Sequence, residues 1–310
     1  MQAASPTVAS AKTASAPAPL IAARMLFKTP PLPDRETIGF IQSFCGPDTM
    51  TQSLRFLRYS ITDGIAEILM DNGPVNALNV PMLDELLACF ETAAADDSVR
   101  AIILGSAVPG RFCAGLDLKA FAKDDTDGVR ALLERLYTRF TDLQYRLGKP
   151  SIAAVNGTAR GGGMTLSISC DMVVADAGAD LGYPEIDVGL LPAIHFAHLP
   201  RIIGRHRAFD LLFTGRSFGA PEALELGLVS RLAAPGTVLA EAHALARVLA
   251  AKPPRVLKMA REAFMRECDS DYRRGVAAAV ENFCNVAATP ESKAAITAFV
   301  ERQEQRRQKR

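Results

Sequence analysis

The sequence has almost no excess of charge of either sign and no long hydrophobic run. Its 310 residues include 35 Lys and Arg against 34 Asp and Glu, a formal net charge of +1. A near-neutral chain without a basic stripe offers little to attract nucleic acid. No apolar run is long enough to cross a bilayer. We therefore expect neither a nucleic-acid partner nor a membrane partner.

Cysteine and histidine are few and scattered. No C-x-x-C pair and no regular spacing connects the six cysteines, which are Cys45, Cys89, Cys113, Cys170, Cys268 and Cys284. This pattern argues against a metal cluster and against a disulfide framework, and it fits a reducing compartment. We expect a cytoplasmic protein without a metal site.

Residues 1–50 differ in composition from the rest of the chain. The first 20 residues are rich in Ala, Ser and Pro, and no acidic residue precedes Asp34. This composition favours a disordered or non-native N-terminal extension. It is also compatible with a transit peptide.

From Leu54 onward, patterns typical of strands and helices alternate. The sequence predicts strands on both sides of a Thr-Asp-Gly turn at 62–64 and buried strands at 99–107, 150–157 and 172–178. It also predicts a helix capped by Asn79 and a helix over 126–147, each with an apolar stripe at helical spacing. Helical patterns dominate after about residue 205. We therefore expect an α/β core over residues 51–250 and a helical C-terminal subdomain over 251–310.

A run of three glycines marks a turn between a predicted strand and a predicted helix, in "GTARGGGMT" at 157–165. The G-x-G-x-x-G pattern of dinucleotide sites and the G-K-[ST] ending of a P-loop are both absent. The remaining interpretations are a tight packing turn or a helix N-terminus whose N–H groups face a developing negative charge. "GRFCAGLDLKAF" at 110–121 forms a second strand-to-helix turn in this prediction. Two such turns on neighbouring parallel strands could form an oxyanion hole.

From Leu54 to the C-terminus, the chain resembles the enoyl-CoA hydratase/isomerase family, the crotonase superfamily. The motifs that carry the likeness are "PVNALN" (74–79), "FCAGLDL" (112–118), "AAVNGTARGGGMTLSISCDMVVAD" (153–176), "YPEIDVGLLP" (183–192), "GRSFGAPEALELGLV" (215–229) and "AFVERQ" (298–303). The resemblance implies a crotonase-like ββα spiral core and a homotrimer or a dimer of trimers. It also implies no permanently bound cofactor, the substrate being an acyl group carried as a coenzyme A thioester.

The same resemblance assigns the binding residues. The N–H groups of Leu116 and Gly162 correspond to the two oxyanion donors of the family. Coenzyme A contacts are implied around Ala114 and Asp117. Phe299 and Arg302 resemble an aromatic and a basic residue that hold the nucleotide, often on a neighbouring subunit. Ordinary helix packing for the phenylalanine and a solvated charge for the arginine are the alternatives.

The catalytic residues depart from the usual family pattern. Hydratases of the family usually carry two glutamates, but this chain has Thr165 at the first position and Glu185 at the second. A single glutamate suits proton transfer between two carbons, so enoyl-CoA isomerisation ranks first and hydration close behind. His195 is a candidate second acid or base, or a packed core residue. The alternatives are a catalytically idle acyl-CoA-binding paralogue and a hydratase-lyase that acts on an aromatic enoyl-CoA.

Overall fold

The computed structural model describes residues 51–119, 126–268 and 272–308, so the predicted extension over 1–50 lies outside it. The strands are β1 (Thr51–Ser53), β2 (Leu57–Thr62), β3 (Ile65–Met70), β4 (Ala101–Ser106), β5 (Arg111–Cys113), β6 (Ser151–Val155), β7 (Thr158–Arg160), β8 (Met172–Asp176), β9 (Asp180–Gly182), β10 (Ser217–Gly219) and β11 (Arg231–Ala233). The helices are α2 (Val80–Ala95), α3 (Thr126–Leu133), α4 (Phe140–Arg146), α5 (Gly162–Ser169), α6 (His195–Ile203), α7 (Arg205–Thr214), α8 (Ala220–Leu226), α9 (Val238–Ala250), α10 (Pro254–Cys268), α11 (Tyr272–Ala287) and α12 (Pro290–Gln308). A π-helical turn (Glu134–Arg139) joins α3 to α4, and a 3₁₀ helix (Pro184–Val188) follows β9. No helix in these ranges is long and apolar enough to cross a membrane.

The large sheet has seven strands in the order β1-β2-β3-β4-β6-β8-β11. It begins with a hairpin, because Asp63 and Gly64 adopt left-handed backbone angles (φ 53° and 73°) that turn β2 into β3. From β3 to β11 the strands are parallel. The predicted buried strands are confirmed. Strand β11 was not predicted, since its surroundings have a helical pattern.

A second, small sheet runs in the order β10-β9-β7-β5, and β5, β7 and β9 are parallel. Each turn of the chain passes from the large sheet to the small one, from β4 to β5, from β6 to β7 and from β8 to β9. This spiral confirms the predicted fold class. The strands of the small sheet have three residues each, which is too short for alternation to reveal them in the sequence.

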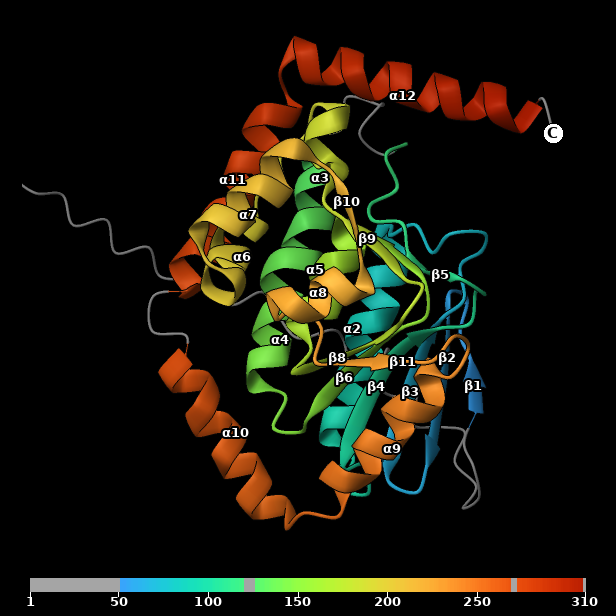
Figure 1. The fold of residues 1–310 in the computed structure, drawn as a ribbon, viewed down its shortest axis with the longest axis vertical. Helices are drawn as coiled ribbons and strands as arrows, with labels where there is room; N and C mark the ends of the chain where they lie inside the picture. Colours follow the sequence, from blue (N-terminus) through green and yellow to red (C-terminus); the bar gives the residue numbers. More distant parts are fainter. Residues whose placement is uncertain (1–50, 120–125, 269–271, 309–310) are drawn as a thin grey trace, which may run out of the picture.

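Helices cover both faces of the large sheet (Figure 1). Helix α9 packs its buried Val238, Ala242 and Leu245 in one apolar cluster with residues of β3, β4, β6 and β8. Helix α2 belongs to the larger core cluster. The Asn79 side chain caps α2 by accepting a hydrogen bond from the Met82 N–H at 2.9 Å, as the sequence predicts. The predicted apolar stripe of α2 is buried.

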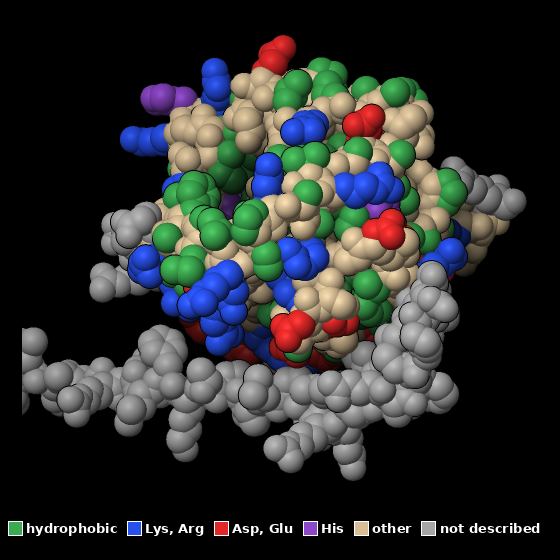
Figure 2. All heavy atoms as spheres, turned by 90° about the horizontal axis from the view of Figure 1, so that it is seen from below, with side chains coloured by type: hydrophobic (Ala, Val, Ile, Leu, Met, Phe, Trp, Pro, Cys, Tyr) green, Lys and Arg blue, Asp and Glu red, His purple; other side chains and the backbone are tan. Residues whose placement is uncertain are grey.

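The C-terminal helices spread over the molecule. In Figure 1, α10 lies at one end, away from the small sheet, and α12 lies across the opposite end. Three large apolar side chains of α10, Val256, Met259 and Phe264, are each more than 60% exposed. Seen from the α10 end, hydrophobic, basic and acidic side chains are interspersed (Figure 2). That mixture agrees with the near-neutral composition.

Gly163 sets how closely α5 approaches the end of β5. A Cβ at this position would lie 2.4 Å from the Cys113 carbonyl oxygen, which is backbone and cannot swing away. We expect Gly163→Ala to destabilise the protein by about 1–3 kcal/mol through overpacking, which outweighs the roughly 1 kcal/mol gained in helix propensity. Urea unfolding measures the change. The control Gly178→Ala, whose Cβ would make only an ordinary 3.4 Å contact, should shift stability by less than about 0.5 kcal/mol.

Candidate active site

The ends of three parallel strands supply the candidate catalytic groups. Leu116 follows β5, Gly162 follows β7, and Glu185 follows β9. Because β5, β7 and β9 are neighbours in one sheet, their carboxyl ends open on the same edge, which is the usual position of ligand sites in parallel sheets. All three residues line one cavity of about 540 Å³.

The turns after β5 and β7 lie against each other. A Cβ on Gly115 would be 2.9 Å from the Arg160 carbonyl oxygen and 3.4 Å from the Gly162 nitrogen. Leu116 forms an isolated bridge with Leu78, in which the Leu78 N–H donates to Gly115 and the Asp117 N–H donates back. The sequence predicted that a helix starts after β5. In the structure residues 114–119 form a loop instead, because the backbone on both sides of Leu116 pairs with Leu78.

The N–H groups of Leu116 and Gly162 are unused by the rest of the described chain. No hydrogen bond from either group to another described residue is found. Gly162 is the first residue of α5, where N–H groups have no partner within the helix. Two free N–H groups at adjacent turns can stabilise negative charge on one oxygen.

The carboxylate of Glu185 lies beside the first glycine of the triplet. A Cβ on Gly161 would be 2.8 Å from Glu185 Oε1. The φ of Gly161 is 46°, a backbone conformation that residues other than glycine rarely adopt. Glu185 Oε2 is buried and has no hydrogen-bond partner in the described chain. Burial raises the pKa of Glu185 to about 7. A carboxyl group with this pKa can both accept and donate a proton near neutral pH.

Thr165 and His195 lie together, outside the cavity lining. Both are buried, and Thr165 Oγ1 is 3.1 Å from His195 Nε2. The Thr165 N–H donates to the Gly161 carbonyl at 3.0 Å. Burial, followed by the neighbouring His198, lowers the pKa of His195 well below its usual value. The pair therefore sits behind the glycine turn as a neutral polar contact.

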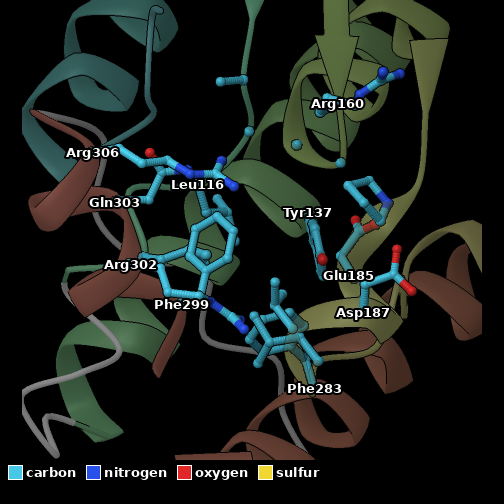
Figure 3. A pocket seen from close by; sticks show the side chains of 18 residues that line it. Leu116, Tyr137, Arg160, Glu185, Asp187, Phe283, Phe299, Arg302, Gln303 and Arg306 are labelled. Carbon is cyan, nitrogen blue, oxygen red and sulfur yellow. The ribbon is translucent and has the colours of Figure 1, made fainter. Parts of the chain in front are cut away.

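The residues implied for coenzyme A divide into two groups. Ala114, Phe299 and Arg302 line the cavity, whereas Asp117 does not. The Asp117 carboxylate accepts a hydrogen bond from the Lys119 N–H at 3.1 Å. Phe299 and Arg302 belong to α12 of the same chain, so this helix covers the cavity of its own subunit (Figure 3).

Sequence reasoning missed several residues of the lining. Tyr137 comes from the π-helical turn, and Phe283 from α11. Arg306 adds positive charge to that of Arg302, whereas Arg160, which also lines the cavity, is ion-paired with Asp180. The apolar stripe predicted over 126–147 indicated a buried helix, but no sequence signal distinguished Tyr137 from its neighbours. No group of three or more metal-binding side chains occurs within the described ranges.

Comparison with known proteins establishes the family. The family model of enoyl-CoA hydratase/isomerase matches residues 60–309. The chain therefore belongs to the enoyl-CoA hydratase/isomerase family.

Individual relatives agree with this assignment. The chain is 34% identical to the Bacillus subtilis protein YngF over 73% of this chain and 87% of that protein. It is 32% identical to a short-chain-enoyl-CoA hydratase from Clostridium acetobutylicum, over 77% of this chain and 93% of the relative. The crystal structure of an enoyl-CoA hydratase/isomerase from Xanthobacter autotrophicus superposes with a TM-score of 0.73 at 27% identity, covering 82% of this chain and 99% of that one.

The buried carboxyl of Glu185 should make stability depend on pH. Its pKa rises from 4.5 to about 7 on folding, so the folded state binds this proton more tightly and loses stability as pH rises from about 4.5 to 7. We expect Glu185→Gln to be more stable than wild type at pH 8 by up to about 3 kcal/mol and equal to it below pH 4.5. Urea titrations across this range measure the difference. The exposed Asp187 on the same helix provides the control: a similar gain for Asp187→Asn would contradict the assignment.

The contact between Thr165 and His195 should be energetically coupled. Thr165→Val leaves a buried imidazole nitrogen unpaired, which costs about 1–3 kcal/mol. In a His195→Leu background the same substitution should cost at least 0.5 kcal/mol less, because the partner is already gone. Unfolding free energies of the four proteins in this cycle measure the coupling, and strictly additive effects would exclude the contact.

Proposed function

We propose that the cavity binds the thioester end of an acyl-CoA and that Glu185 moves a proton at the carbon next to the carbonyl. The observation that carries this proposal is the Glu185 carboxylate, whose Oε2 has no partner in the described chain and which lies beside the Gly161–Gly162 turn in a cavity lined by apolar side chains such as Leu116 and Leu190. Its pKa of about 7 makes it an effective base and acid.

In this proposal, Leu116 and Gly162 stabilise the intermediate. Removing a proton next to a thioester places negative charge on the carbonyl oxygen. The two free N–H groups would donate to that oxygen, and each donor of this kind is worth about 3 kcal/mol in the transition state. Both donors are backbone groups, so the side chain at position 116 is free to shape the acyl pocket.

The coenzyme A part would lie toward α12. Arg302 and Arg306 bring positive charge to the lining, which suits the phosphates of coenzyme A. Phe299 lies on the same helix as these arginines and offers a flat apolar surface for the adenine. Ala114 would contact the coenzyme A part of the substrate through its backbone. Asp117 stays a prediction that the cavity lining does not support.

We propose that Thr165 and His195 position the glycine turn and do not exchange protons with the substrate. The Gly161 carbonyl, which accepts from the Thr165 N–H, belongs to the peptide group that carries the Gly162 N–H. Holding this carbonyl directs the N–H into the cavity. Glu185 then acts as the buried carboxyl group of the lining that exchanges protons with the substrate. Isomerisation of an enoyl-CoA needs one such group, and hydration also needs a site for water.

The oligomer and the location remain predictions. We propose a homotrimer or a dimer of trimers, supported by the exposed apolar side chains of α10, such as Phe264 at 67% exposure, which a second copy would cover. A cytoplasmic location is consistent with the free, unpaired cysteines of the described chain.

Proton exchange tests the role of Glu185. We expect the wild-type protein to exchange α protons of saturated acyl-CoAs in D₂O, and Glu185→Gln to be slower by about 10²–10⁴-fold, the usual contribution of a general base. Because the base must be deprotonated, kcat/KM for exchange should rise with pH and be half-maximal near pH 7. Mass spectrometry of the recovered acyl-CoA measures the deuterium.

Asp187→Asn is the matched control, since Asp187 lines the same cavity from the same 3₁₀ helix but is exposed. It should change exchange by only a few-fold. Unchanged exchange in Glu185→Gln would refute the assignment. Acyl-CoA binding without any exchange by the wild-type protein would favour the idle paralogue instead.

A further inference from the structure

The continuous helical segment formed by α3, the π-helical turn and α4 lines the cavity through Tyr137, and it contains one irregular turn. Residues Glu134–Arg139 are π-helical, and the Phe140 N–H donates to the Arg135 carbonyl five residues earlier. Such turns add one residue to a helical turn and often occur at functional sites. Here the consecutive residues Leu136 and Tyr137 are both buried, at 0% and 3% exposure.

Tyr137 brings a polar group into an otherwise apolar part of the cavity. It lines the same cavity as Glu185, together with Leu118, Val188 and Phe283. Figure 3 shows the Tyr137 side chain between the α12 residues on one side and Glu185 on the other. Glu185 also contributes to raising the pKa of Tyr137, second to burial itself, so the two groups interact.

The hydroxyl of Tyr137 and one carboxylate oxygen of Glu185 have no hydrogen-bond partner among the described residues. The Tyr137 hydroxyl makes no hydrogen bond to another described residue, and Glu185 Oε2 is buried and unpaired. Buried polar groups in folded proteins are nearly always hydrogen-bonded, to protein, water or ligand. Two unpaired groups facing one apolar cavity therefore mark the place of an oxygen atom from water or from the substrate.

We propose that Tyr137 and Glu185 together hold the oxygen that is added to, or removed from, the β carbon of the acyl group. The inference rests on the proposed function and deepens it: the substrates would be 2-enoyl-CoA and 3-hydroxyacyl-CoA thioesters, and the reaction a hydration. The phenol takes the role that a second carboxylate has in two-glutamate hydratases, whereas Thr165 is buried elsewhere.

The step balances with these two groups alone. A water molecule donates one O–H to the Glu185 carboxylate and the other to the phenol oxygen of Tyr137. As the water oxygen bonds to the β carbon, its first proton passes to Glu185 and the electron pair of the double bond moves onto the thioester oxygen. Glu185 then returns this proton to the α carbon. In the reverse reaction Glu185 takes the α proton and delivers it to the departing hydroxyl, which leaves as water while it stays hydrogen-bonded to the phenol oxygen of Tyr137.

The experiment separates water addition from proton exchange. Wild type, Tyr137→Phe, Glu185→Gln and Tyr183→Phe are each given 2-enoyl-CoAs of four and eight carbons and cinnamoyl-CoA in H₂¹⁸O. The matching saturated acyl-CoAs are given in D₂O, and mass spectrometry follows both labels. Tyr183 is the matched control, because its hydroxyl is also buried and unpaired near Glu185 but lies outside the cavity lining.

We expect Tyr137→Phe to lose about 10²-fold in ¹⁸O incorporation, the effect of removing one hydrogen-bond partner of the reacting oxygen, and to keep deuterium exchange within about 3-fold. Retained exchange also shows that the variant is folded. Glu185→Gln should lose both activities and Tyr183→Phe neither.

Other outcomes overturn the inference in distinguishable ways. Wild-type exchange without ¹⁸O incorporation would refute the inference and leave the proposed function intact. Hydration by Tyr137→Phe at the wild-type rate, or an equal loss of both activities, would show that the phenol does not hold the oxygen. A wild-type protein with neither activity would refute the proposed function, and the inference with it.

Discussion

The parallel pairing of β5, β7 and β9 is the constraint on which the rest of the structure depends. These three-residue strands bury little apolar surface themselves, yet they align the turns that carry Leu116, Gly162 and Glu185. Close backbone packing makes the alignment possible. A Cβ on Gly157 would lie 2.1 Å from the Gly110 carbonyl oxygen, and one on Gly163 would lie 2.4 Å from that of Cys113. Side chains at these positions would force the turns apart, so glycine is required by contact with backbone atoms rather than by flexibility.

Burial of Glu185 follows from the same geometry. The 3₁₀ helix begins directly after β9, so the side chain of its second residue meets the Gly161 turn, where only a hydrogen leaves room for it. Desolvation then raises the pKa to about 7. A carboxylate at this position costs folding free energy at neutral pH, and no described neighbour offsets that cost with a hydrogen bond to Oε2. Such an uncompensated cost is typical of a group that finds its partner in a ligand.

Residue patterns in the sequence were sufficient for β2, β3, β4, β6 and β8 of the large sheet, for helix α2 with its Asn79 cap, and for the glycine turn at the start of α5. Each depends on local signals: continuous apolar runs, a capping side chain and a strand-to-helix glycine run. Three features depended on tertiary contacts and were not predicted. The strands of the small sheet are too short for periodicity to reveal them. No residue pattern in the sequence marks the π-helical turn at Tyr137. The contact between Thr165 and His195 joins residues that are 30 positions apart. The position of α12 over its own cavity likewise follows from packing and not from the motif "AFVERQ".

The proposed oxyanion donors are backbone groups, so they do not depend on the side chain at position 165. Position 165 lies on the first turn of α5, where its N–H holds the Gly161 carbonyl whatever the side chain is. The threonine hydroxyl is hydrogen-bonded to His195, and both side chains are buried outside the cavity lining. A substitution here can therefore change the acid–base groups and leave the donor geometry in place.

The polar side chain that shares the cavity lining with Glu185 is that of Tyr137, which comes from the π-helical turn. Because Tyr137 belongs to the π-helical turn and not to the glycine turn, it can vary independently of the donors. In the proposed reaction, the choice between moving a proton and adding water would depend on Tyr137 of the π-helical turn rather than on the ends of the strands.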